Sequence, residues 1–108
     1  MFKINGITWQ LKFVRPYDEM LRRDDGTLSI GMCDNELKMI FINENLRGQM
    51  LRRVLCHELT HAAMFSYDVS LTDEQEELLA DLIATYGEEI IQITNQLFGK
   101  IKMRDYIK

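Results

Sequence analysis

The chain has 108 residues and a formal net charge of −4, which predicts one small domain over residues 1–108 with a single core. An acidic chain lacks the basic patch that nucleic-acid binders need, so no nucleic-acid partner is expected. No apolar run approaches the roughly 20 residues that span a bilayer, so no membrane partner is expected either. The two cysteines have no CxxC spacing and the first segment is unlike a signal peptide, which predicts a cytoplasmic protein.

The first half of the chain has the patterns of strands. Apolar and polar residues alternate in ITWQLKFV (7–14), as in a half-buried strand, and Pro16 ends this run. The segment PYDEMLRR that follows is predicted to form a short helix or turn. Two further runs, TLSIGMC and LKMIFIN, flank Asp34, Asn35 and Glu36, which predicts a β-hairpin.

A first helix is predicted after the hairpin. Asn43 or Asn45 is expected to cap it, and it is expected to end near Ser66. The segment is apolar on most sides, so the helix is predicted to be largely buried.

A second helix is predicted from the capping box of Thr72 and Gln75 to about Phe98, with Gly99 as its stop. Its main apolar stripe points largely away from Glu77, so this helix is expected to be covered both on the side of Glu77 and on the side of the stripe. The stripe consists of Leu79, Leu82, Ile83, Tyr86, Ile90 and Ile93.

The first helix contains HELTH, residues 57–61. His57 and His61 differ by about 40° around an α-helix and lie one turn apart on one face, where both imidazoles can bind one tetrahedral zinc ion. Glu58 lies about 100° from His57, so its carboxylate can take a proton from an attacking water without binding the metal. The motif therefore supplies two zinc ligands and a general base. A pair of core histidines without metal is the competing interpretation.

A third ligand is required, and no third histidine exists. In EELLAD of the second helix, Glu77 and Asp81 share a face at spacing i and i+4. Glu77 can bind zinc, while Asp81 can accept the other N–H of a ligand histidine. Glu76 is the competing third ligand. The small residues Ala80 and Ala84 would let this helix approach the first closely.

HELTH followed by EELLAD resembles the arrangement of the gluzincins, which combine HExxH with a later ExxxD. The short chain, the preceding hairpin and this segment resemble the ImmA/IrrE-like metallopeptidases of phages and mobile elements, or minimal gluzincins. The resemblance implies a zincin-like α+β fold, in which a small sheet of about three strands packs against the active-site helix and a long helix that follows. It also implies that the strand before the active-site helix, Leu37 to Asn43, binds substrate along an exposed edge.

The resemblance further implies residue roles and partners. His57, His61 and Glu77 would bind Zn²⁺, Glu58 would be the general base, and Asp81 would hold a ligand histidine. The substrate would be a peptide or protein, and a transcription regulator is a possible partner because several relatives act on repressors.

The chain lacks the third histidine that larger gluzincins use to stabilise the oxyanion, and Tyr67 is the candidate donor in its place. Activity is therefore expected to be weak or latent. A catalytically silent zinc-binding regulatory module that acts through a protein partner is the alternative function. A metal-free helical interaction domain is the second alternative.

Overall fold

The structure is a computed structural model and describes residues 1–103. Four strands form one mixed sheet in the order β1-β2-β4-β3. Strand β1 (Phe2–Ile4) pairs antiparallel with β2 (Ile7–Val14), which pairs parallel with β4 (Met39–Asn43), and β4 pairs antiparallel with β3 (Gly31–Asp34). Helices α1 (Gly48–Ser66) and α2 (Asp73–Met103) follow the sheet. The predicted α+β class, with a small sheet beside two helices of which the second is long, is confirmed.

The strand predictions are confirmed in part, because β3 begins at Gly31 instead of near Thr27 and includes Asp34, which was predicted to lie in the turn. Strand β2 has the predicted bounds, and the predicted hairpin is β3 with β4. The prediction of about three strands is one strand short, because β1 was not predicted. Asn5 and Gly6 make the turn between β1 and β2 with positive φ angles of 50° and 76°. An Asn-Gly pair is a strong hairpin signal and could have revealed this strand. The segment after Pro16 contains a single 3-10 turn, Glu19–Leu21.

The predicted start of α1 is wrong. The helix begins at Gly48 after Arg47, and no side chain caps it. Asn43 belongs to β4, and its Oδ1 accepts a hydrogen bond from the backbone N–H of Asn45 at 2.8 Å. The side chain of Asn43 therefore stabilises the turn after the strand instead of the helix end. The predicted end of the helix at Ser66 is confirmed.

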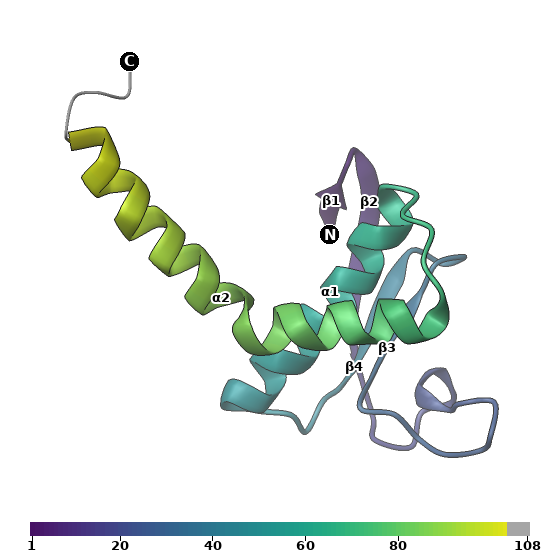
Figure 1. The fold of residues 1–108 in the computed structure, drawn as a ribbon. Coiled ribbons are helices and arrows are strands. Elements are labelled where there is room, and N and C mark those ends of the chain that lie inside the picture. The colour runs from purple at the N-terminus through teal and green to yellow at the C-terminus, as the bar shows by residue number, and fades with distance from the viewer. Residues whose placement is uncertain (104–108) are drawn as a thin grey trace.

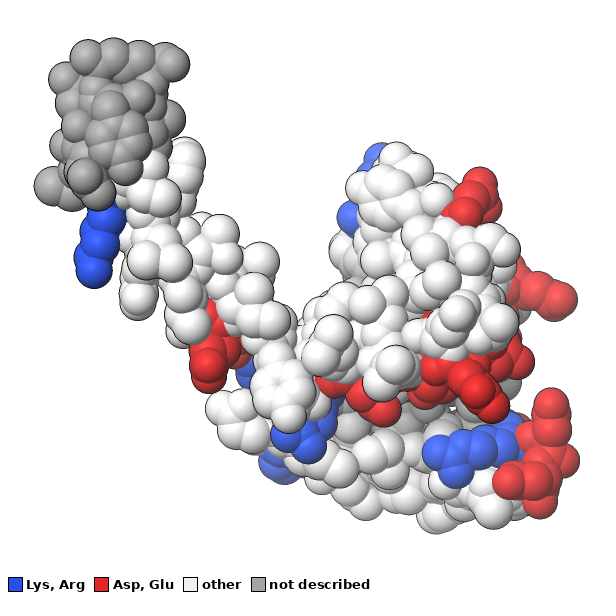
Figure 2. All heavy atoms as spheres, in the orientation of Figure 1, with Lys and Arg blue, Asp and Glu red and all other residues white. Residues whose placement is uncertain are grey.

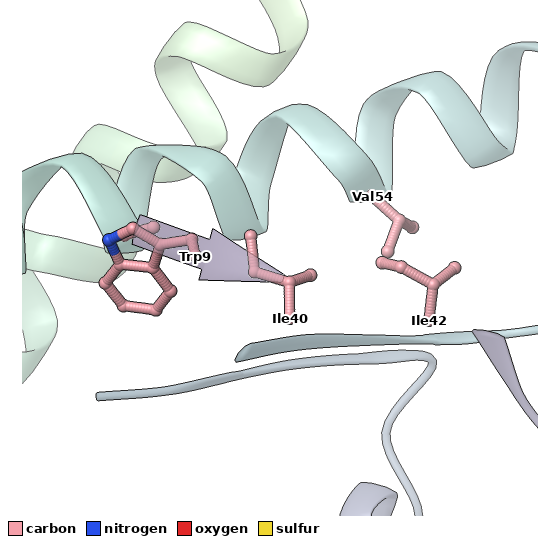
Figure 3. Packing of buried hydrophobic residues seen from close by; sticks show 5 residues of the cluster. Trp9, Ile40, Ile42 and Val54 are labelled. Atoms are coloured by element: carbon pink, nitrogen blue, oxygen red, sulfur yellow. The ribbon is translucent and has the colours of Figure 1, made fainter. Parts of the chain in front are cut away.

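The main core lies between the sheet and α1. Trp9 and Ile40 are fully buried beneath the helix, and Val54 points from α1 toward Ile42 (Figure 3). The indole N–H of Trp9 donates a hydrogen bond to Ser66 Oγ at 2.8 Å. This bond fixes the C-terminal end of α1 over β2.

Helix α2 crosses α1 with its first half and then extends away from the rest of the molecule (Figure 1). We call residues 85–103 of α2 the arm and residues 1–84 the body. The predicted stop at Gly99 is wrong, because the helix continues through it to Met103. The prediction that α2 is covered on two sides is also wrong, because Tyr86 and Ile90 expose 57% and 55% of their surface. None of the described helices is long and apolar enough to cross a membrane.

Candidate metal centre

One turn of α1 brings His57 and His61 together, as their spacing predicts. The ring centroids lie 4.9 Å apart, and the two Nε2 atoms lie 3.2 Å apart. His61 is buried and His57 is partly buried, because this face of α1 lies under the first two turns of α2.

Glu77 of α2 faces both rings. Its Oε2 lies 3.2 Å from His57 Nε2, and its Oε1 lies 2.9 Å from His61 Nε2. Ligand atoms at about 2.0–2.1 Å from a tetrahedral zinc ion lie about 3.3 Å from one another. The separations of these three groups are close to that value, so the two rings and the carboxylate could hold one metal ion between them.

The outer nitrogens of the two rings also face carboxylates. His57 Nδ1 lies 2.9 Å from Asp81 Oδ1, and His61 Nδ1 lies 2.8 Å from Glu76 Oε1. A neutral ring that donates its Nδ1–H to a carboxylate has a lone pair on Nε2. Both Nε2 lone pairs then point toward Glu77, and a cation at the centre would satisfy the two rings and the carboxylate together. The chemistry of this donor set therefore fits a metal ion such as Zn²⁺.

Glu76 has a position that the sequence analysis did not assign to it. It is the competing third ligand of the sequence prediction, but its carboxylate lies beside the outer nitrogen of His61 and is related to that ring as Asp81 is to His57. Each histidine thus has its own orienting carboxylate. The adjacent pair Glu76-Glu77 could have suggested this arrangement, because neighbouring side chains at the edge of a helix can reach two different rings.

Helix packing brings these carboxylates to the rings. Thr72 and Gln75 exchange the two predicted capping hydrogen bonds, which fix the start of α2 one turn before Glu76. Ala80 is fully buried, and its small side chain allows the close approach of α2 to α1 that the sequence predicted. The position of the cap and the size of this residue together determine which carboxylates reach α1.

Glu58 lies beside the two histidines and exposes 8% of its surface. Burial raises the pKa of Glu58, while the neighbouring His57 and His61 lower it and Glu77 raises it. Strand β3 packs closely against Glu58 at Gly31. A Cβ atom at this position would lie only 3.1 Å from Oε2 of Glu58. A buried carboxylate with a raised pKa is suited to accept a proton and give it back.

A cavity of about 270 Å³ opens beside the metal ligands. His57, Glu58 and Glu77 line it together with Arg53, which lies one turn before His57 on α1. Arg53 was not predicted to be a site residue, although its spacing of four residues from His57 places it on the same helix face. The remaining lining residues include Arg23, Ser29, Ile30, Gly31 and Asp81.

Two further expectations concern the strand that binds substrate and the position of Tyr67. The strand before α1 was expected to have an exposed edge, but β4 is paired on one side with β2 and on the other with β3. The open edge next to the helix belongs to β3, because the hairpin folds back on the outer side of β4. Tyr67 follows the last residue of α1 and exposes 59% of its surface. It is not among the described residues that line the cavity, and its role as an oxyanion donor stays a prediction.

Comparison with known proteins gives one result. Searches of curated proteins and of solved structures found no match. The family model of the IrrE N-terminal-like domain, Peptidase_M78, matches residues 16–91. These residues include β3, β4, all of α1 and every residue of the metal centre, whereas β1 and β2 lie before the match. This match covers more than half of the chain and confirms the resemblance drawn from HELTH and EELLAD, so the chain belongs to the IrrE N-terminal-like domain family.

Proposed function

We propose that the protein is a zinc-dependent metallopeptidase of gluzincin type. The observation that supports this most is the convergence of two imidazole nitrogens and one carboxylate at mutual distances of 2.9–3.2 Å beside the buried Glu58. Membership in a peptidase family points to the same chemistry. We assign His57, His61 and Glu77 as the zinc ligands and Asp81 and Glu76 as the residues that orient the two rings.

The residues of the chain have distinct roles in this proposal. Zinc, when bound, polarises the scissile carbonyl and lowers the pKa of water. Glu58 accepts the proton of the attacking water and returns it to the leaving amine, a transfer that its raised pKa favours. Asp81 and Glu76 hold both rings in the tautomer that binds metal.

Substrate is proposed to bind along β3. Among the described strands, β3 is the one that has an open edge and also packs against α1 near Glu58. An extended peptide can add to such an edge through main-chain hydrogen bonds. The substrate is proposed to be a peptide or protein in the cytoplasm, and a transcription regulator is the partner suggested by family analogy.

The test of catalysis separates the peptidase from a silent zinc-binding module. Purified protein and the Glu58→Gln variant are each loaded with zinc, and their metal content and cleavage of a diverse peptide library are measured by mass spectrometry. We expect both proteins to bind one zinc ion and the variant to lose at least about 100-fold in turnover. Tyr67→Phe measures whether the phenol contributes.

The outcome that contradicts catalysis is zinc binding without cleavage by the unsubstituted protein. The alternative function, a regulatory module that uses the same three ligands, would then be favoured. The position of Tyr67 outside the cavity is the observation that supports this alternative, because the expected oxyanion donor is then not beside Glu58.

The ligand assignment has a separate test. We expect Glu77→Ala to abolish tight zinc binding, since it removes a ligand. Asp81→Asn and Glu76→Gln remove orienting carboxylates and should each weaken zinc binding by about 10–100-fold. Zinc affinity measured by competition with a chromophoric chelator distinguishes these variants. If Glu77→Ala keeps full affinity and Glu76→Ala does not, the third ligand is Glu76.

A further inference from the structure

The arm of α2 has almost no packing against the body. Every residue from Thr85 to Lys102 is exposed except Gly87 and Gly99. Among the residues that the structure describes, the ion pair that joins arm and body is Arg52 with Glu88, at 2.6 Å between Nη2 and Oε2. Most helix stability in proteins comes from tertiary packing of an amphipathic face. The described part of the chain supplies the arm with little such packing, so a partner that covers the arm would stabilise it.

The arm is amphipathic, and its apolar side faces away from the body. At about 100° per residue, five apolar side chains fall within an arc of about 80°. Glu88, which contacts the body, lies about 180° from the middle of this arc. The five side chains are Tyr86, Ile90, Ile93, Leu97 and Ile101. The helix thus holds the body with its polar side and exposes its apolar side to solvent, which is the reverse of an ordinary surface helix.

The spacing of these residues is that of a coiled-coil seam. Tyr86, Ile90, Ile93 and Leu97 follow one another at intervals of four, three and four residues. This is the alternation of a and d positions in the heptad repeat, where each side chain packs between residues of a second helix. The pattern calls for another helix as the partner.

The exposed apolar area of this arc reaches the lower limit for a specific dimer. Its five side chains expose 39–57% of their surface. Together they expose roughly 500 Å² per copy, so two copies would cover about 1,000 Å² in total, which is the least that a specific interface needs. Much of the arm is uncharged in the view of Figure 2.

The charges of the arm favour a second copy in antiparallel orientation. Glu88 and Glu89 lie near its start, whereas Lys100 and Lys102 lie near its end. In an antiparallel pair the acidic end of one arm lies beside the basic end of the other, while a parallel pair places like charges together. The antiparallel register that sets Ile93 opposite Leu97 also sets Ile90 opposite Lys100, next to Glu89.

We propose that two copies of this chain associate through their arms, which pair as an antiparallel two-stranded coiled coil with the two bodies at opposite ends. The interface is isologous, so the contact of Ile93 with Leu97 occurs twice. The bodies do not take part in it, and each metal centre stays open.

The test uses the full chain and sedimentation equilibrium at about 1–200 µM. We expect a species of twice the 12.8 kDa monomer mass at the upper end of this range. The double variant Ile90→Lys with Leu97→Lys places charges in the seam and should weaken association at least 100-fold. The matched control, Gln92→Lys with Asn95→Lys, adds the same charges to the polar side and should associate like the unsubstituted chain.

A second pair of variants tests the orientation. Glu89→Lys should weaken association about 2–5-fold, and adding Lys100→Glu to it should restore the original constant. Emission of the buried Trp9, the single tryptophan of the chain, shows in every variant whether the body is folded. Zinc-site variants such as Glu77→Ala should leave association unchanged, so this proposal and the proposed function fail independently.

Three outcomes would overturn the proposal. The unsubstituted chain could stay monomeric over the whole concentration range. The seam variant could associate as well as the polar-side control, with Trp9 emission unchanged in both. The charge swap could fail to restore the loss caused by Glu89→Lys, which would exclude the antiparallel pairing.

Discussion

The two halves of α2 belong to one helix but have different surroundings. In the first half, Ala80 is fully buried against α1, and Glu76, Glu77 and Asp81 each contact a histidine ring. In the arm, large apolar side chains face solvent. The difference teaches that a hydrophobic stripe does not by itself identify the side on which a helix packs. In this protein small and acidic residues make the contact inside the chain, and large apolar residues are left for a contact outside it.

Zinc binding should cause the largest difference in stability between body and arm. If the three-ligand site is correct, zinc at 100 times its dissociation constant stabilises the body by about 2.7 kcal/mol. The melting temperature, followed by Trp9 emission, should rise by about 10–20 °C. A chelator should reverse the shift, and the Glu77→Ala variant should not show it. An equal shift in the variant would show that zinc acts elsewhere.

Two glycine substitutions, one in the body and one in the arm, should change stability in opposite directions. A Cβ atom on Gly31 would lie 2.7 Å from Cγ1 of Val54, so Gly31→Ala should destabilise the body by about 1–3 kcal/mol. Nothing lies within 4 Å of a Cβ atom on Gly99, so Gly99→Ala should stabilise the arm by up to about 1 kcal/mol. Urea unfolding and far-ultraviolet circular dichroism measure the two effects. Equal effects of the two substitutions would contradict the close packing of β3 on α1.

Removing one side-chain hydroxyl from the body and one from the arm compares what a hydrogen bond contributes to stability in each region. Ser66→Ala leaves the buried indole N–H of Trp9 without its acceptor and should cost about 1–2 kcal/mol. Thr94 donates to the carbonyl of Ile90 at 2.8 Å on the exposed arm, and Thr94→Ala should change stability by less than about 0.5 kcal/mol. Urea unfolding of both variants provides the comparison. A cost for Thr94→Ala as large as that for Ser66→Ala would show that the arm is not solvated.

The smallest expected effect concerns the ion pair between body and arm. Arg52 and Glu88 are both more than half exposed, so Glu88→Gln should cost less than about 1 kcal/mol and less still at high salt. Glu36→Gln, at an exposed glutamate of the body that is in no ion pair among the described residues, is the control. Thermal unfolding at two salt concentrations measures both variants, and a cost above about 2 kcal/mol would mean that the pair holds the arm in place.

The features that could be predicted are local ones. The spacing of His57 and His61 fixes their common face on any α-helix, and the capping box of Thr72 and Gln75 forms as the sequence predicts. The alternation in residues 7–14 gives β2 its correct bounds. The start of α1 could not be found from its sequence, because Arg47 caps it without a side-chain hydrogen bond and Asn43, one of the two expected caps, accepts from the backbone of Asn45 instead.

The sequence by itself determined that this chain presents two imidazoles on one helix face with Glu58 about 100° from His57, because helical geometry depends only on spacing. The tertiary structure decided which carboxylates meet them, since Glu76, Glu77 and Asp81 reach different ring nitrogens only after α2 packs through Ala80. It also decided that β4 is enclosed and that the arm is exposed. Pairing of strands and burial of a helix face depend on segments far apart in the chain, and local patterns do not specify those contacts.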